Sequence, residues 1–302
     1  MGWAGAGEFE VVEGEILTAL LTAFGQRMAA RARAGWAVMV RRRARRTMIV
    51  GPRHQQPAFV LATTLILAFV AVLALDPVAP GLLGGATGAW RAFLKTLTGF
   101  GEGVEILVAS AAILIVALGV SVEGLTRRIR AAIVEIGFAA AFAFAAVAGS
   151  GIAASLIKNA IGRARPEHVT GSGIFELHPL AFSARFASFP SGHSTTAGAT
   201  AMVLALLFPR LRWPILAAGI AVALSRILLD AHYPSDVVAG FGFGAAFTLA
   251  LAQGSARRNL VFRQDGAGRL EPKAADRPGN WPDVLAALIA RAKAKTTSTS
   301  EG

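Results

Sequence analysis

Three basic residues in the second half of the chain have the spacing of a binding site. Lys158 and Arg165 lie seven residues apart, which is two helical turns, so both side chains leave one face if the helix continues through them. Pro166 then ends that helix. A third cation, Arg226, stands at the end of a later apolar segment. Three cations without matching carboxylates indicate a site for a multiply charged anion, most simply phosphate.

Two histidines accompany these cations and can divide the work of nucleophile and acid. His193 closes the run Pro190-Ser191-Gly192-His193, which directly precedes an apolar segment. Gly192 leaves backbone N–H groups open, and a helix beginning there adds its positive end, so this run predicts an anion site. His232 precedes Asp236 by four residues. The carboxylate is expected to accept a hydrogen bond from the imidazole and fix its tautomer.

The composition of the chain requires a membrane around these residues. Of 302 residues, 54% are hydrophobic and only 16% are charged, against about 25% in an average globular protein. There are no cysteines, which excludes disulfides, thiolate metal sites and cysteine nucleophiles. The net charge of +12 could suggest nucleic acid, but long apolar runs separate the charges, and no nucleic-acid partner is predicted.

Six segments are apolar enough to cross a bilayer, which takes about 20 helical residues. They cover residues 57–75, 104–122, 131–158, 193–209, 213–230 and 235–252, and the fourth has the shortest apolar part. Counting Lys and Arg places 23 of 30 on one side, which predicts that both termini are cytoplasmic. The fold class is therefore an all-α, polytopic membrane protein. The cations and histidines then lie at the outer, periplasmic ends of helices 3–6.

These residues carry a resemblance to a known family. The patterns Lys158-x6-Arg165-Pro166, Pro190-Ser191-Gly192-His193 and Ser225-Arg226-x5-His232-x3-Asp236 resemble the three motifs of the type 2 phosphatidic acid phosphatase superfamily. Every motif position is filled, in the family's order and at its internal spacings. With the six-span layout, the resemblance covers residues 57–253.

The resemblance implies a phosphatase that needs no metal or other cofactor. His232 corresponds to the family's nucleophile, which forms a phosphohistidine, and Asp236 to the carboxylate that orients it. His193 corresponds to the general acid. Lys158, Arg165, Ser191, Gly192 and Arg226 correspond to the groups that bind the phosphate oxygens.

The expected substrate is a lipid phosphate or diphosphate monoester in the inner membrane of a bacterium. The motifs read only the phosphate, so undecaprenyl diphosphate, phosphatidylglycerol phosphate, phosphatidic acid and lipid A phosphates remain open. One alternative is phosphotransfer from the same intermediate to a lipid or sugar hydroxyl. Another is an anion or lipid-headgroup transporter, although the chain has no visible repeat. Vanadate-dependent haloperoxidases share the motifs but are soluble proteins.

The rest of the chain is expected to flank this domain. Residues 1–56 read as a basic, amphipathic cytoplasmic arm whose arginine cluster at 41–46 would be attracted to anionic lipid, or else as a partly disordered arm. Residues 254–302 are polar and read as a disordered cytoplasmic tail. Gly240 and Gly244 form a small-xxx-small face, which predicts close helix packing. The sequence predicts no oligomeric state.

Overall fold

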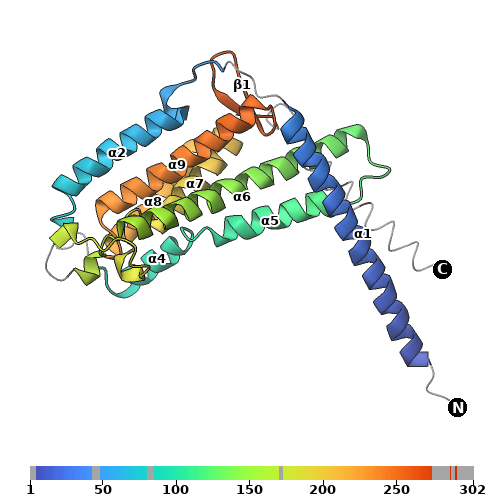
Figure 1. Cartoon of the computed structure of the whole chain (residues 1–302), viewed down its shortest axis with the longest axis horizontal. Helices are drawn as coiled ribbons and strands as arrows, with labels where there is room; N and C mark the ends of the chain where they lie inside the picture. Colours follow the sequence, from blue (N-terminus) through green and yellow to red (C-terminus); the bar gives the residue numbers. More distant parts are fainter. Residues whose placement is uncertain are drawn as a thin grey trace. The chain divides into compact units, whose positions relative to one another are not determined.

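A computed structural model describes residues 5–42, 48–79, 85–169 and 173–273, with the single positions 286 and 290. Its helices are α1 (Gly5–Arg41), α2 (Pro57–Ala74), α4 (Gly88–Gly99), α5 (Val104–Gly119), α6 (Arg127–Ile161), α7 (Gly192–Leu207), α8 (Arg212–Leu228) and α9 (Pro234–Arg257). A short antiparallel hairpin follows, with strands β1 (Phe262–Gln264) and β2 (Leu270–Pro272). The predicted helical fold is confirmed (Figure 1).

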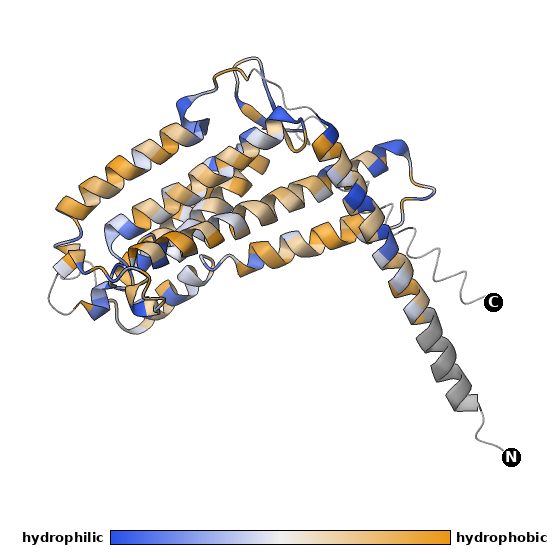
Figure 2. Ribbon diagram, in the orientation of Figure 1, coloured by the Kyte–Doolittle hydropathy of each residue, from blue (hydrophilic) through white to orange (hydrophobic). Residues whose placement is uncertain are grey.

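Each of the six predicted spans coincides with a helix, but not all are long enough to cross a bilayer. Within the described residues, five stretches qualify by length and composition: 57–74, 88–119, 127–161, 209–228 and 234–257. The helix at the predicted fourth span, α7, has only 16 residues. A sixth span therefore remains a prediction. Hydrophobic residues predominate along most of the helices, and hydrophilic residues gather in the loops and at helix ends (Figure 2). On α2, for example, Leu65, Ile66 and Phe69 are more than half exposed, as expected for side chains that face lipid.

The chain divides into two compact units. One contains residues 1–43, 112–138 and 277–302. Its small core is built on Ala117, Ala132 and Ile133. Two arginines of α1 donate to the last carbonyls of α5: Arg27 to Gly119 at 3.1 Å and Arg31 to Ala117 at 2.8 Å. These bonds satisfy carbonyl groups that a helix leaves open at its C-terminus.

The second unit, residues 44–111 and 139–276, carries all the predicted site residues. Here α9 packs against both α7 and α2, and α7 also packs against α8. Glycines make the α7–α9 contact close. A Cβ on Gly240 would overlap the carbonyl oxygen of Ser191, and one on Gly244 would overlap that of Thr195. The packing role predicted for the two glycines of α9 is thus confirmed.

The expectation of a disordered tail from residue 254 is wrong for its first part. The helix α9 continues to Arg257, and the hairpin occupies residues 262–272. Phe262 is fully buried, with its ring 5.0 Å from that of Phe142. The side chain of Gln264 bonds both backbone groups of Ile49 at 3.0–3.1 Å. A short apolar run within a polar segment therefore finds partners far away in sequence. Residues 274–302 lie outside the described part, apart from positions 286 and 290.

Candidate active site

The site lies where α6 and α8 end and where α7 and α9 begin. Lys158 is in the last turn of α6. The helix ends at Ile161, and Gly162 follows with a φ of +65°, the left-handed conformation in which glycine commonly ends a helix. The expectation that the helix continues to Pro166 is therefore wrong, and Arg165 lies in the connecting loop. Its charge nevertheless acts on Lys158.

The start of α7 supplies the second part of the site. Ser191 is the N-cap residue, and its side-chain oxygen accepts hydrogen bonds from the backbone N–H and the hydroxyl of Ser194 at 3.4 and 3.0 Å. Gly192 follows as the first residue of α7, and a Cβ at this position would lie 2.7 Å from Nζ of Lys158. The ammonium group of Lys158 therefore lies close to Gly192 in the first turn of α7, where the helix dipole also favours an anion.

The three cations of the motifs have few hydrogen-bond partners among the described residues. Nη1 of Arg226 donates to the hydroxyl of Thr98 on α4 at 3.2 Å. The Nε atoms of Arg165 and Arg226 are buried and have no hydrogen-bond partner in the described part of the chain. Within the same residues, neither arginine nor Lys158 forms an ion pair with a carboxylate. Buried donors of this kind are rare unless a ligand completes them.

His193 lies in the first turn of α7, close to these cations. Electrostatic interactions connect it with Lys158, Arg165, Arg226 and His232. Its side chain is about one-third exposed, and Nε2 lies 3.8 Å from the carboxylate of Glu102. The general acid predicted from sequence therefore stands at the accessible side of the cluster.

His232 and Asp236 lie deeper, with Ser188 between them. The Nδ1 atom of His232 is 3.6 Å from the carboxylate and 3.4 Å from the hydroxyl of Ser188. That hydroxyl donates its proton to Asp236 at 2.5 Å, so its oxygen is left to accept one from Nδ1 of His232. Tyr233 N–H also donates to Asp236, at 3.0 Å. The tautomer with Nδ1 protonated leaves Nε2 of His232 free.

Burial sets the charge of His232. The side chain is almost fully buried, and this desolvation lowers its pKa, although Asp236 opposes the shift. The imidazole is therefore neutral near pH 7. A neutral imidazole with a free Nε2 is the form that can act as a nucleophile.

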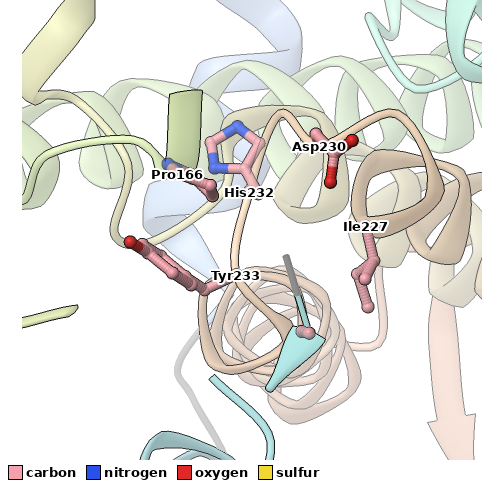
Figure 3. A pocket seen from close by; sticks show the side chains of 6 residues that line it. Pro166, Ile227, Asp230, His232 and Tyr233 are labelled. Atoms are coloured by element: carbon pink, nitrogen blue, oxygen red, sulfur yellow. The ribbon is translucent and has the colours of Figure 1, made fainter. Parts of the chain in front are cut away.

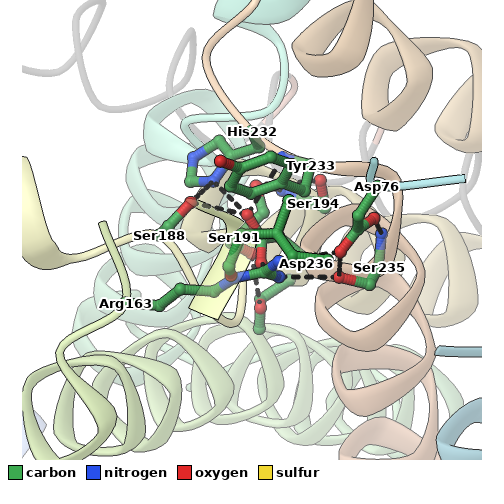
Figure 4. A network of polar contacts seen from close by, with 11 residues as sticks. Asp76, Arg163, Ser188, Ser191, Ser194, His232, Tyr233, Ser235 and Asp236 are labelled. Carbon is green, nitrogen blue, oxygen red and sulfur yellow. Dashed lines mark hydrogen bonds and ion pairs between the residues drawn. The ribbon is translucent and has the colours of Figure 1, made fainter. Parts of the chain in front are cut away.

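Four residues that the sequence analysis did not identify lie in the hydrogen-bond network of the site. Besides Ser188 and Thr98, these are Arg163 and Asp76, which form a buried network with Asp236 (Figure 4). Asp76 directly follows the first predicted span, and Arg163 lies between two residues of the first motif, Lys158 and Arg165. The sequence held one signal for this network: the carboxylate of Asp76 ends an apolar segment and has no cation near it in sequence, which indicates a distant partner.

A small open pocket lies beside the buried histidine (Figure 3). It is lined by Ala79, Pro166, Ile227, Asp230, His232 and Tyr233. The structure thus gathers every predicted site residue at one end of the second unit, while their individual roles stay predictions.

The chain is similar to a known family and to several known proteins. The PAP2 superfamily matches residues 139–260. The chain is 39% identical to the lipid A 1-phosphatase of Rhizobium johnstonii over 233 residues, 76% of this chain and 93% of that protein. It is 43% identical to the lipid A 1-phosphatase of Rhizobium etli, over 61% of this chain and 82% of that one. A crystal structure of a transmembrane PAP2 type phosphatidylglycerolphosphate phosphatase from Bacillus subtilis matches 65% of this chain and 94% of its own, with a TM-score of 0.45 and 20% identity.

The match to the family covers all three motifs, from Lys158 to Asp236. The similarity to the Rhizobium johnstonii protein extends over nearly the whole of that relative. The chain therefore belongs to the PAP2 superfamily, and it is a multi-span membrane phosphatase that acts on lipid phosphates.

Proposed function

We propose that this protein hydrolyses the 1-phosphate of lipid A at the outer face of a bacterial inner membrane. The observation that carries the proposal is the cluster of Lys158, Arg165 and Arg226 around two histidines, in which the Nε atoms of both arginines lack a hydrogen-bond partner among the described residues. The choice of lipid rests on the two lipid A 1-phosphatases, whose similarity extends over 93% and 82% of their lengths. The match to an undecaprenyl-diphosphatase of Bacillus subtilis covers only 32% of that protein.

In the proposed reaction, Nε2 of His232 attacks phosphorus and the bond to the sugar oxygen breaks. His193 gives its proton to that leaving oxygen. Water then attacks the phosphohistidine and passes a proton to His193, which releases inorganic phosphate and restores both histidines. Asp236 and Ser188 hold Nδ1 of His232 throughout, so the attacking nitrogen keeps its orientation.

The cations act on the phosphoryl group itself. Lys158, Arg165 and Arg226, with Ser191 and the Gly192 N–H, stabilise the equatorial oxygens of the five-coordinate state. Removal of one such group raises the barrier by about 3–4 kcal/mol. The reaction requires no metal ion.

The test is phosphate release by the detergent-solubilised protein in the presence of EDTA. Substrates are lipid A carrying a 1-phosphate, undecaprenyl diphosphate, phosphatidylglycerol phosphate and phosphatidic acid, with His232→Ala as the inactive control. We expect lipid A to be the best substrate and the variant to lose activity by a factor on the order of 10⁴ or more. Preference for another lipid would refute the choice of substrate. If the phosphoryl group passes to an added alcohol and not to water, the protein is a phosphotransferase and the proposed hydrolysis is refuted.

The orientation in the membrane is part of the proposal. Both termini lie in the cytoplasm, as the distribution of Lys and Arg favours. The basic arm, residues 1–56, then adjoins the anionic inner leaflet. Fusions of a reporter that is active only in the cytoplasm, at each terminus and after residue 169, test this: the termini should be active and the loop silent.

A further inference from the structure

A second charged cluster lies next to His232, on the side of Asp236. Two of its members, Arg163 and Asp76, are not part of the family motifs. Arg163 follows the end of α6 and extends its guanidinium group between two carboxylates (Figure 4). Nη2 lies 2.8 Å from Asp76, which follows α2, and Nη1 lies 2.8 Å from Asp236 on α9. Nε donates to the carbonyl of Ile174 at 3.1 Å. All three nitrogens of the group are therefore used, and its direction is fixed.

The cluster is closed to solvent and fully hydrogen-bonded. The side chains of Asp76 and Asp236 are completely buried, and that of Arg163 is 6% exposed. Ser235 bonds both sides of the network: its N–H donates to Asp76 at 3.0 Å, and Nη1 of Arg163 donates to its hydroxyl at 2.8 Å. The ring of Tyr233 lies 4.2 Å from the guanidinium carbon. Buried charges are stable only in such complete arrangements.

The charges of the cluster do not cancel. One guanidinium and two carboxylates leave a net charge of −1 next to His232, on the side of Nδ1. An imidazole that attacks phosphorus gains positive charge, and a fixed negative charge nearby stabilises that change. Too much negative charge would instead keep the imidazole protonated and unable to attack.

We propose that Arg163 and Asp76 are positioning residues that orient Asp236 and set the charge beside His232. Arg163 reduces the negative charge that the imidazole experiences, whereas Asp76 fixes Arg163 and maintains a net charge of −1. The role of this charge in the reaction rests on the proposed function. The titration of His232 does not depend on the proposed function. An experiment can therefore refute the positioning role and the proposed function separately.

Other charged groups also face His232, but the test leaves them unchanged. They are Arg165 after α6, Arg226 on α8, His193 on α7 and Asp230 in the preceding turn. The test replaces only Arg163 and Asp76, with neutral side chains of similar size.

The measurement is the pKa of His232 in the detergent-solubilised protein, followed by ¹⁵N NMR of labelled histidines. The signal is assigned from its loss in His232→Gln. Arg163→Gln should raise this pKa and Asp76→Asn should lower it, each by about one pH unit. The double variant removes one charge of each sign and should titrate like the wild type. Arg185→Gln, an exposed arginine of the same loop, is the matched control and should change nothing.

Activity gives a second, independent readout. The acid limb of the pH profile of kcat/KM for lipid A 1-phosphate should move with the NMR value in each variant. Arg163→Lys keeps the charge but cannot contact both carboxylates as the guanidinium group does. We therefore expect kcat to fall while the pKa of His232 and KM stay unchanged. Shifts in the same direction for Arg163→Gln and Asp76→Asn, or none in either, would overturn the proposal. If Arg163→Gln does not fold, Asp76→Asn decides alone: a lowered pKa of His232 supports the proposal, and an unchanged or raised pKa overturns it.

Discussion

Gly240 of α9 holds the start of α7 in place, and its replacement should damage the active site without touching a catalytic group. In Gly240→Ala, the new Cβ would overlap the carbonyl oxygen of Ser191 and lie 3.2 Å from the backbone N of Thr195. Backbone atoms cannot rotate away as a side chain does. The two helices must therefore separate by about half an ångström or more, since interiors are close-packed.

The separation acts on both histidines at once. The N–H of Ser191 donates to the carbonyl of Asp236 at 3.0 Å, so this bond ties the start of α7 to that of α9. Moving the helices apart carries His193 away from His232. A misplacement approaching 1 Å costs up to about 100-fold in rate, so kcat should fall by about 10- to 100-fold. Overpacking should also lower the free energy of unfolding by about 1–3 kcal/mol.

The assay combines kcat on the lipid phosphate with thermal unfolding in the same detergent. Gly254→Ala is the matched control, because Gly254 lies in the last turns of α9 with no atom within 4 Å of a Cβ. This control should keep full activity and match the wild type in stability or exceed it by up to about 1 kcal/mol. Wild-type kcat and stability in Gly240→Ala would refute the packing argument. So would equal damage from Gly254→Ala.

Three further predictions follow from other contacts. Ser188→Ala removes the hydroxyl between His232 and Asp236, so kcat should fall by about 10- to 100-fold with little change in KM; an unchanged kcat would show that the hydroxyl does not orient the imidazole. Because burial lowers the pKa of His232 below its usual 6.5, the unfolded state binds the proton more tightly. The contribution of His232 to stability is therefore complete above pH 6.5 and is lost as the pH falls below that value. The unfolding temperature should drop between about pH 7 and 5, and it should drop less in His232→Gln. Equal pH dependence in both proteins would contradict this. Gln264→Ala breaks both bonds to Ile49 and should cost about 1–3 kcal/mol of stability at unchanged kcat, whereas a loss of kcat would mean that the hairpin supports the site.

Much of the fold was predictable because the membrane simplifies the problem. Helices are nearly the only way to satisfy the backbone in lipid, so apolar length alone located the helices now seen as α2, α5, α6, α7, α8 and α9. Residues that favour helix N-termini indicated where two helices of the site begin: Pro234 is the first residue of α9, and Ser191 is the N-cap of α7. The hairpin was missed because Phe262 and Gln264 find their partners 120 and 215 residues away, and no local pattern records such contacts.

The motif residues were predictable for a different reason. Their chemistry depends on residue type and short spacing, which a sequence displays directly. The path of the chain between them was not: Gly162 ends α6 four residues before Pro166, and Arg165 reaches the site from a loop. Arg165 therefore lies at the site as predicted, although it belongs to a loop and not to the predicted helix.

Arg163 and Arg165 mark the limit of what residue type can predict. They lie two residues apart and carry the same charge, yet their surroundings are opposite. Arg163 lies between two buried carboxylates, whereas the Nε of Arg165 has no partner within the described residues. His232 stands between these two environments, with Asp236 on its Nδ1 side and the charge of Arg165 acting on it as well. Asp76, 87 residues from Arg163 along the chain, and Asp236 hold the guanidinium group of Arg163 from two sides, and residue type and local spacing alone cannot distinguish the two arginines.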